Sequence, residues 1–293
     1  MTSQVVGVDV GGTSTRAVSF DCSLLPVASA VAGTPRGAVA IAELVTALVA
    51  DVASAPSSIA IGVPGRVDSM RGVVSSAVNL GITAPSMIGE LVRARVGVPV
   101  HVENDVNAAA LGAFEHFGLA PTQSLAYVNV GTGIAAGFVL AGHLWRGAFG
   151  GAGEIGHVPM QAHAPACRCG QVGCAEAVGS GRAVADVPSR RDDVVTATAW
   201  AVQLCAMTVD VDVVVVGGGM TRPAETFEPA LLAALAQREQ ASPMLADVGL
   251  ARRVMVAPAD VPLGSLGAVL AARDGSVLQM SPDGATIEGQ TAL

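Results

Sequence analysis

The amino-acid sequence predicts two related α/β lobes, because a strand, a glycine loop and a second strand follow one another twice in the chain. The first such unit joins Val5–Val10 to Arg16–Phe20, and the second joins Leu125–Val130 to Ile134–Leu140. Helices and further strands follow each unit, which is the order expected of layered α/β architecture. A ligand site is expected in the cleft between two such lobes.

The remaining elements follow from hydrophobic periodicity and from the turn residues that bound it. Short β-branched runs that end at Gly, Pro or Asp indicate strands, and apolar residues three or four apart indicate helices. In chain order we expect a strand at Val27–Val31, a helix at Val39–Val52, a strand at Ile59–Val63, a helix at Met87–Val96, a strand at Val98–Val102, a helix at Val106–Phe117, a helix at Val195–Val209, a strand at Val213–Val216, a helix at Ala224–Ala236, a strand at Val254–Ala257 and a helix at Gly264–Ala272.

The composition predicts a soluble cytoplasmic protein. A chain of 293 residues with 51% hydrophobic content can bury a large core, which excludes disorder as the main state. Its apolar runs are shorter than the roughly 20 residues of a membrane span, and its first residues lack the pattern of a secretion signal. The net charge is −8 and all 16 basic residues are scattered arginines, so no nucleic-acid partner is expected.

The first glycine loop has the residues of a phosphate site. Asp9 ends a strand and is followed by Gly11, Gly12 and Thr13. Glycine lets phosphate oxygens approach backbone N–H groups, the Thr13 hydroxyl suits the same oxygens, and the Asp9 carboxylate suits Mg²⁺. The alternative for such a turn taken alone is an ordinary β-hairpin.

Two further glycine loops favour the phosphate interpretation. They contain Gly131, Thr132 and Gly133 in the second strand pair, and Gly217, Gly218 and Gly219 after a strand of four valines. The sequence has neither the Walker pattern nor the dinucleotide fingerprint, so a phosphate site here is not of the P-loop or Rossmann type.

A histidine and three cysteines predict a structural zinc site. His157, Cys167, Cys169 and Cys174 supply one imidazole and three thiols, which is a complete tetrahedral ligand set. Because all four positions are filled by protein, the metal would not be catalytic. The alternative is three reduced cysteines on a loop without a metal.

Asp105 is a candidate general base, because it stands at a strand-to-helix junction where a carboxylate can accept a proton from a substrate hydroxyl. The alternative role for Asn104 or Asp105 is to cap the N-terminus of the following helix.

These motifs in this order resemble the ROK family of sugar kinases and sugar-responsive repressors. The resemblance runs from about Val5 to about Ala272. It rests on Asp9-Val-Gly-Gly-Thr13, Glu103-Asn-Asp105, Gly131-Thr-Gly133, the stretch from Gly147 to His157 and the cysteine loop from Cys167 to Glu176. Ser14 stands where the family often has Lys, and only 40 residues separate Glu176 from Gly217, where the family usually has a longer helical insert.

The resemblance implies an actin-like or hexokinase-like fold, of the ribonuclease H type, with sugar and ATP meeting in the cleft. It implies a small lobe of residues 1–105, completed by a helix at about 261–273, and a large lobe of residues 106–260. Residues after Arg273 show no clear periodicity, so we expect a flexible tail at residues 274–293. The resemblance also implies a homodimer, Asp105 as the base, and sugar contacts from Gly65, Asn79, Asn104, Asp105, Glu154, His157 and Glu176.

The resulting functional hypothesis is an ATP- and Mg²⁺-dependent kinase that phosphorylates a hexose or N-acetylhexosamine at O6. Rival hypotheses are a non-catalytic sugar sensor, a glucokinase that uses polyphosphate, and a zinc hydrolase, which the filled zinc ligand set disfavours. No helix-turn-helix segment precedes Val5, so the repressor branch of the family is not expected. Glucose, mannose and their N-acetylamino forms all stay open as substrates.

Overall fold

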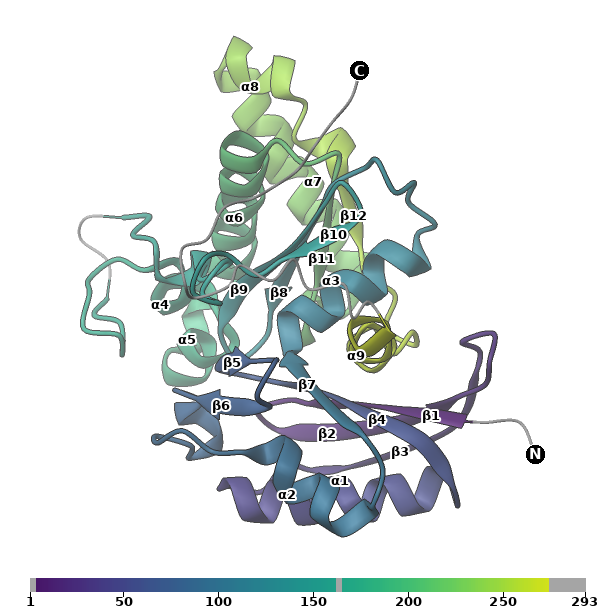
Figure 1. Cartoon of the computed structure of the whole chain (residues 1–293). Helices are drawn as coiled ribbons and strands as arrows, with labels where there is room; N and C mark the ends of the chain where they lie inside the picture. The colour runs from purple at the N-terminus through teal and green to yellow at the C-terminus, as the bar shows by residue number, and fades with distance from the viewer. Residues whose placement is uncertain (1–3, 162–164, 274–293) are drawn as a thin grey trace, which may run out of the picture.

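The computed structural model describes residues 4–161 and 165–273, which form two α/β lobes, each built on a five-stranded mixed sheet (Figure 1). The first sheet has the order β3-β2-β1-β4-β7. Its strands are β1 (Gln4–Val10), β2 (Ser14–Phe20), β3 (Pro26–Gly33), β4 (Pro56–Val63) and β7 (Val100–Asn104). β2 is antiparallel to both β1 and β3, whereas β1, β4 and β7 run parallel.

The second sheet repeats this topology in the order β10-β9-β8-β11-β12. Its strands are β8 (Leu125–Val130), β9 (Ile134–Leu140), β10 (His143–Trp145), β11 (Val213–Gly217) and β12 (Val254–Val256). Here β9 is antiparallel to both β8 and β10, whereas β8, β11 and β12 run parallel. The expected pair of related lobes, with an actin- and hexokinase-like fold, is confirmed.

The outer helices cover the sheets because their apolar residues recur at helical spacing. In the first lobe α1 (Ala38–Val52) buries Ile41, Val45 and Leu48 against the sheet, and α2 (Ile88–Val96) lies beside α1. In the second lobe α6 (Asp193–Val209) and α7 (Ala224–Ala241) cover the sheet. The central parallel strands are buried on both faces, which explains the run of four valines in β11.

Two helices cross between the sheets. They are α3 (Asp105–His116) and α9 (Leu263–Arg273), and α9 also packs on β1 and β4 of the first sheet (Figure 1). Their backbones approach closely at two glycines. A Cβ on Gly112 would lie 2.0 Å from the carbonyl oxygen of Leu263, and one on Gly267 would lie 1.6 Å from that of Ala108.

Gly267→Ala is therefore expected to destabilise the protein by about 1–3 kcal/mol, the usual cost of overpacking, despite the better helix propensity of alanine. The contact is with backbone, so the two helices must separate to admit the methyl group. The free energy of unfolding in urea would measure the effect. Gly33→Ala is the matched control, because a Cβ at Gly33 meets no atom within 4 Å. Equal stability of the two variants would contradict the close crossing.

Several short elements were not predicted. They are β5 (Arg66–Asp68), β6 (Val73–Ser75), β10, α4 (Ala175–Gly179), α5 (Gly181–Asp186), α8 (Pro243–Val248) and the 3₁₀ turns η1 (Val78–Leu80), η2 (Ile155–His157), η3 (Pro188–Arg191), η4 (Gly219–Thr221) and η5 (Ala251–Arg253). Each is too short to show a periodicity of its own. The tail predicted at residues 274–293 lies outside the described residues.

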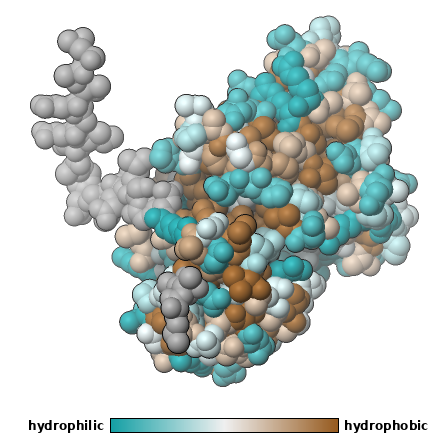
Figure 2. All heavy atoms as spheres, turned by 90° about the vertical axis from the view of Figure 1, so that its right-hand side faces the viewer, coloured by the Kyte–Doolittle hydropathy of each residue, from teal (hydrophilic) through white to brown (hydrophobic). Residues whose placement is uncertain are grey.

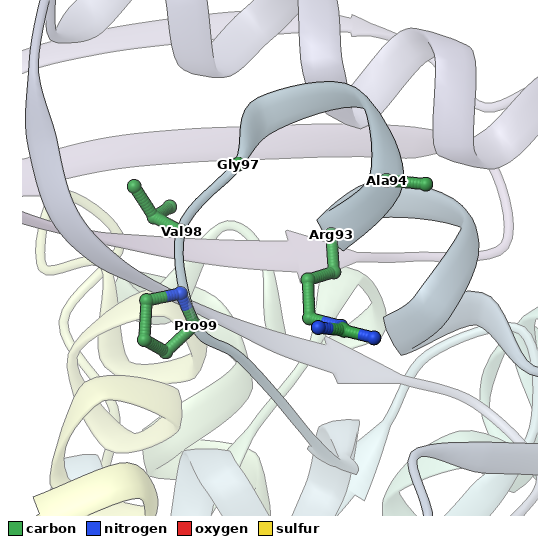
Figure 3. Close-up of a pocket in the computed structure, with 5 residues that line it drawn as sticks. All are labelled: Arg93, Ala94, Gly97, Val98 and Pro99. Atoms are coloured by element: carbon green, nitrogen blue, oxygen red, sulfur yellow. The ribbon is translucent and has the colours of Figure 1, made fainter.

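The face drawn in Figure 2 carries groups of apolar side chains among hydrophilic ones. Figure 3 shows a hollow at the end of α2, lined by Arg93, Ala94, Gly97, Val98 and Pro99. This hollow lies at the start of β7, at the opposite end of that strand from Asn104. Among residues 4–161 and 165–273, no helix combines the length and the apolarity needed to cross a membrane.

Candidate functional site

The first glycine loop joins β1 to β2 and is fixed by Thr34. The Gly11 N–H donates to the Ser14 carbonyl at 2.9 Å, and the Thr34 hydroxyl donates to the Gly11 carbonyl at 2.8 Å. The Thr34 N–H also donates to the Thr13 carbonyl at 3.1 Å. Gly12 and Thr13 themselves are exposed, so the tip of the loop is accessible to a ligand.

The second glycine loop lies opposite the first. A Cβ placed on Gly12 would be 3.6 Å from the Thr132 hydroxyl oxygen, which brings the tips of the two loops together from different lobes. The start of α5 supports the second loop, since Gly181 and Arg182 donate their N–H groups to the carbonyls of Gly131 and Thr132 at 2.8 and 3.2 Å.

The third glycine loop is beside the second, because β11 and β8 are neighbours in the sheet. Gly218 has φ of +106°, and a Cβ there would lie 2.6 Å from the Asn129 side-chain oxygen. A Cβ on Gly217 would collide with the Tyr127 hydroxyl. Glycine is thus required at both positions, and the three loops share one end of the two sheets.

Two carboxylates with raised pKa values lie at this junction. Asp9 is the last residue but one of β1 and lies beside the start of α9, where a Cβ on Gly264 would be 2.6 Å from Asp9 Oδ2. Burial raises the pKa of Asp9 to about 6, although the neighbouring Arg16 opposes the shift. Burial and the negative charge of Asp9 raise the pKa of Asp105, the first residue of α3, to about 7.

Because its pKa is raised on folding, Asp105 contributes stability below its ordinary pKa of 3.8, and this contribution is lost as the pH rises through about 7. Asp105→Asn removes that dependence. We therefore expect the variant to gain stability relative to the wild type as the pH rises from 4 to 8. Urea unfolding of the ligand-free protein would measure this, with the exposed Asp51→Asn as control. A wild-type-to-variant difference that is constant with pH would contradict the pKa shift.

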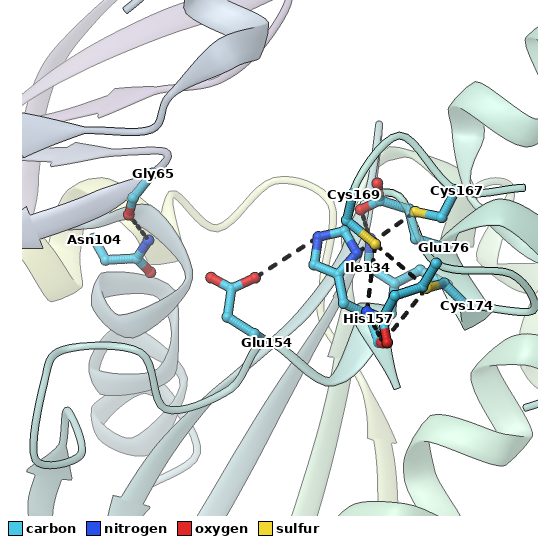
Figure 4. Close-up of polar contacts among 10 residues, drawn as sticks. Gly65, Asn104, Ile134, Glu154, His157, Cys167, Cys169, Cys174 and Glu176 are labelled. Atoms are coloured by element: carbon cyan, nitrogen blue, oxygen red, sulfur yellow. Dashed lines mark hydrogen bonds and ion pairs between the residues drawn. The ribbon is translucent and has the colours of Figure 1, made fainter. Parts of the chain in front are cut away.

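Asn104 connects the helix start to the small lobe. Its side-chain oxygen caps α3 by accepting the N–H groups of Val106 and Asn107 at 3.0 Å, and its Nδ2 donates to the Gly65 carbonyl at 3.1 Å (Figure 4). Capping of this helix is therefore confirmed for Asn104. One N–H of its amide is left to donate to a ligand.

An ion pair between the lobes, formed by Glu103 and Arg146, was not predicted. Glu103, at 1% exposure, accepts a bond from Arg146 of the second lobe at 2.7 Å, and it also accepts from the Asn107 amide and the Ser69 hydroxyl. The carboxylate is thus fully partnered and fixes the segment just before Asp105. The sequence gives a signal for Glu103, which belongs to the Glu103-Asn-Asp105 motif, and none for Arg146.

The predicted zinc ligands meet at one point. The ligand atoms of His157, Cys167, Cys169 and Cys174 all lie within 4.8 Å of one another (Figure 4). His157 Nδ1 is 3.6 Å from Cys167 Sγ, and the Sγ atoms of Cys169 and Cys174 are 3.6 Å apart. A tetrahedral zinc ion with Zn–S bonds of about 2.3 Å has S–S edges of ~3.8 Å, so the cluster fits zinc.

The electrostatics of the cluster agree with metal binding. Hydrogen bonds from the backbone N–H and then the side-chain amide of Gln171 lower the pKa of Cys169 to about 6. Thiolate is the form of cysteine that ligates metal. Burial raises the pKa of Cys174 to about 12, and a bound cation would favour its ionised form instead.

The zinc cluster is joined to the predicted sugar contacts. His157 turns Nδ1 toward the sulfur atoms and Nε2 toward Glu154, whose Oε2 is 4.0 Å away (Figure 4). Glu176, two residues after Cys174, accepts the N–H of Ile134 at 3.2 Å, so its carboxylate lies over the second glycine loop. Asn79, the remaining predicted sugar contact, accepts a hydrogen bond from Arg182 across the lobes.

Comparisons with known proteins agree with this geometry. A model of the ROK family matches residues 5–203. The glucokinase of Streptomyces coelicolor is 35% identical over 188 residues, which are 64% of this chain and 59% of that protein. A putative xylose repressor of Caldicellulosiruptor sp. is 42% identical over 126 residues, 43% of this chain and 31% of the repressor.

Among solved structures, a ROK family glucokinase from Streptomyces griseus, in complex with glucose and AMPPNP, is 25% identical with a TM-score of 0.79. The alignment covers 92% of this chain and 99% of that one. The chain spans 59% of the length of the curated Streptomyces coelicolor glucokinase that it matches. The matched region includes the first two glycine loops, the carboxylate pair and the zinc cluster. The chain belongs to the ROK family.

Proposed function

We propose that this protein is an ATP-dependent kinase that phosphorylates a hexose or N-acetylhexosamine at O6. The observation that carries the proposal is the position of Asp105. It is a half-buried carboxylate with a pKa of about 7, placed where glycine loops from both lobes meet. A group that titrates near neutral pH is well suited to accept a proton from a sugar hydroxyl.

In the proposed reaction Asp105 accepts the O6 proton as the hydroxyl oxygen attacks the γ-phosphorus of ATP. Backbone N–H groups of Gly12, Thr13 and Gly133 would hold phosphate oxygens, because the tips of these loops face each other. Asp9 would hold Mg²⁺, whose chemistry is to neutralise phosphate charge. Glycines Gly217, Gly218 and Gly219 would line the nucleotide side, on the strand next to the second loop.

The sugar would lie between the two lobes, against Glu154, His157, Asn104 and the loops that carry Gly65 and Asn79. Two of these residues point toward each other, since Glu154 faces His157 Nε2. The zinc ligands would hold His157 in place, because Nδ1 on the metal leaves Nε2 facing the sugar. We also propose the lobe boundaries given above and a homodimer.

A non-catalytic sugar sensor is the second candidate, since a repressor is among the relatives. Release of ADP from ATP, measured with glucose, mannose, N-acetylglucosamine and N-acetylmannosamine, separates the two. The proposal predicts turnover with at least one of these sugars, and product analysis should show the phosphate on O6. Sugar binding by calorimetry without turnover would favour the sensor. Faster turnover with polyphosphate than with ATP would replace the proposed donor.

A further inference from the structure

Arg182 lies between the second glycine loop and the small lobe. Its backbone N–H donates to the Thr132 carbonyl at 3.2 Å, so its Cα is held beside the phosphate loop. Its guanidinium extends across to the other lobe and donates to the Asn79 side-chain oxygen. The side chain thus connects the loop proposed for phosphate to the loop proposed for sugar.

Within residues 4–161 and 165–273, Arg182 forms no ion pair with a carboxylate. In the described part of the chain, ion pairs between arginines and carboxylates are formed by Arg71, Arg93, Arg95, Arg146 and Arg253. The partner of Arg182 is instead a neutral amide, and its side chain is only partly exposed. An unpaired arginine beside a glycine loop is an arrangement suited to an anion, because the guanidinium fork matches phosphate oxygens.

Other arginines near the site have different contacts, because Arg36, Arg66 and Arg222 donate to the backbone carbonyls of Asn79, Phe149 and Ala259. The chain contains no lysine, and a serine, Ser14, follows the first glycine loop. Arg146 forms an ion pair with Glu103, and Arg16 stands opposite Asp9 on the neighbouring strand, where its charge lowers the pKa of Asp9. Among the arginines in the described part of the chain, Arg182 alone combines a backbone bond to a glycine loop with a guanidinium that has no carboxylate partner there.

We propose that Arg182 binds the phosphoryl group during its transfer, an inference that rests on the proposed kinase function. The bond between the sugar O6 and the γ-phosphorus forms as the bond to the β-phosphate oxygen breaks, the O6 proton passes to Asp105, and ADP leaves. Arg182 stays protonated throughout and donates to the equatorial phosphoryl oxygens, where negative charge gathers. When it turns to the phosphate, the Asn79 oxygen is released to accept a sugar hydroxyl.

The test compares Arg182→Gln, Arg182→Lys and the control Arg191→Gln, which removes a charge from an exposed position in the same region. With MgATP and the sugar that gives the fastest turnover, Arg182→Gln should lower kcat about 10²- to 10³-fold, with sugar affinity in the absence of nucleotide unchanged. Arg182→Lys should restore part of the rate, because it restores charge without the planar fork. The control should match the wild type.

Two outcomes would overturn the inference. The first is that Arg182 serves only to hold the two lobes together through its hydrogen bond to Asn79. In that case Arg182→Gln and Asn79→Ala would have the same effect on kcat and on the sugar KM, and the double variant would be no less active than either single variant. A wild-type kcat in Arg182→Gln would also refute the inference while leaving the kinase proposal intact.

If the wild type phosphorylates no sugar in the panel, the proposed function is refuted. A binding measurement still tests whether Arg182 contacts the terminal phosphate of the nucleotide. Calorimetry with MgAMPPNP and MgADP reports the contact to the terminal phosphate directly. Arg182→Gln should weaken binding of MgAMPPNP at least tenfold more than binding of MgADP. Equal weakening of both, or of neither, would show that Arg182 does not contact the terminal phosphate.

Discussion

Asp105→Asn is expected to lower kcat about 10²-fold or more while the fold and most of the sugar affinity persist. Asparagine keeps the size of the side chain and its place at the start of α3 but cannot accept the O6 proton. It also removes one of two adjacent negative charges, because Asp9 acts on Asp105 electrostatically. Sugar binding should therefore be retained and the loss should fall on the chemical step.

The measurement is kcat for the best sugar of the panel as a function of pH, alongside the sugar Kd from calorimetry. Wild-type activity should rise as the pH increases through about 7, where Asp105 ionises, and the residual activity of the variant should lack this rise. Asp51→Asn, which changes an exposed carboxylate of α1, is the control. Near wild-type turnover in Asp105→Asn would remove Asp105 from the role of base.

Cys169→Ser is expected to abolish zinc binding, lower the melting temperature and raise the sugar KM about 10- to 100-fold, the usual range when an outer group that orients a site is lost. The physical reason is that two of the metal ligands lie at or within two residues of the proposed sugar contacts. His157 is itself a ligand, and Glu176 stands two residues beyond Cys174. Because Glu176 also contacts the second glycine loop, the KM for ATP should rise as well, but less.

Zinc content by metal analysis should be near one ion per wild-type chain and near zero in the variant. Cys22→Ser is the matched control, since Cys22 is an exposed free cysteine outside the cluster. Full activity of a zinc-free wild-type protein, or an ATP KM that rises more than the sugar KM, would contradict this account of the cluster.

The sequence predicts the main strands and helices well because each shows its own periodicity or turn residues. The strand pair around Gly11 and Gly12 and the helix capped by Asn104 needed only local information. The cluster of His157, Cys167, Cys169 and Cys174 was also predictable, because its three cysteines fall within eight positions of the chain. Local chemistry and close spacing in the chain thus defined much of the candidate site.

The unpredicted contacts all join residues that are distant in the chain. Arg146 reaches Glu103 across 43 positions, and Arg182 reaches Asn79 across 103. Neither arginine belongs to a motif, so nothing local distinguishes it from an ordinary surface arginine. The bond from Ile134 to Glu176 is similar, because the carboxylate was assigned to the sugar and its second contact depends on how two loops pack.

The packing of α9 has a consequence for how the chain acquires its structure. The first sheet is made from residues 4–104, yet one of its faces is covered by a helix formed from residues 263–273. During synthesis α9 cannot cover that face until residues 263–273 have left the ribosome, by which time all strands of the second sheet have been made. The first lobe is therefore the last to be finished. Its contacts span more than 150 residues, which makes slow, late docking of α9 the expected final step of folding.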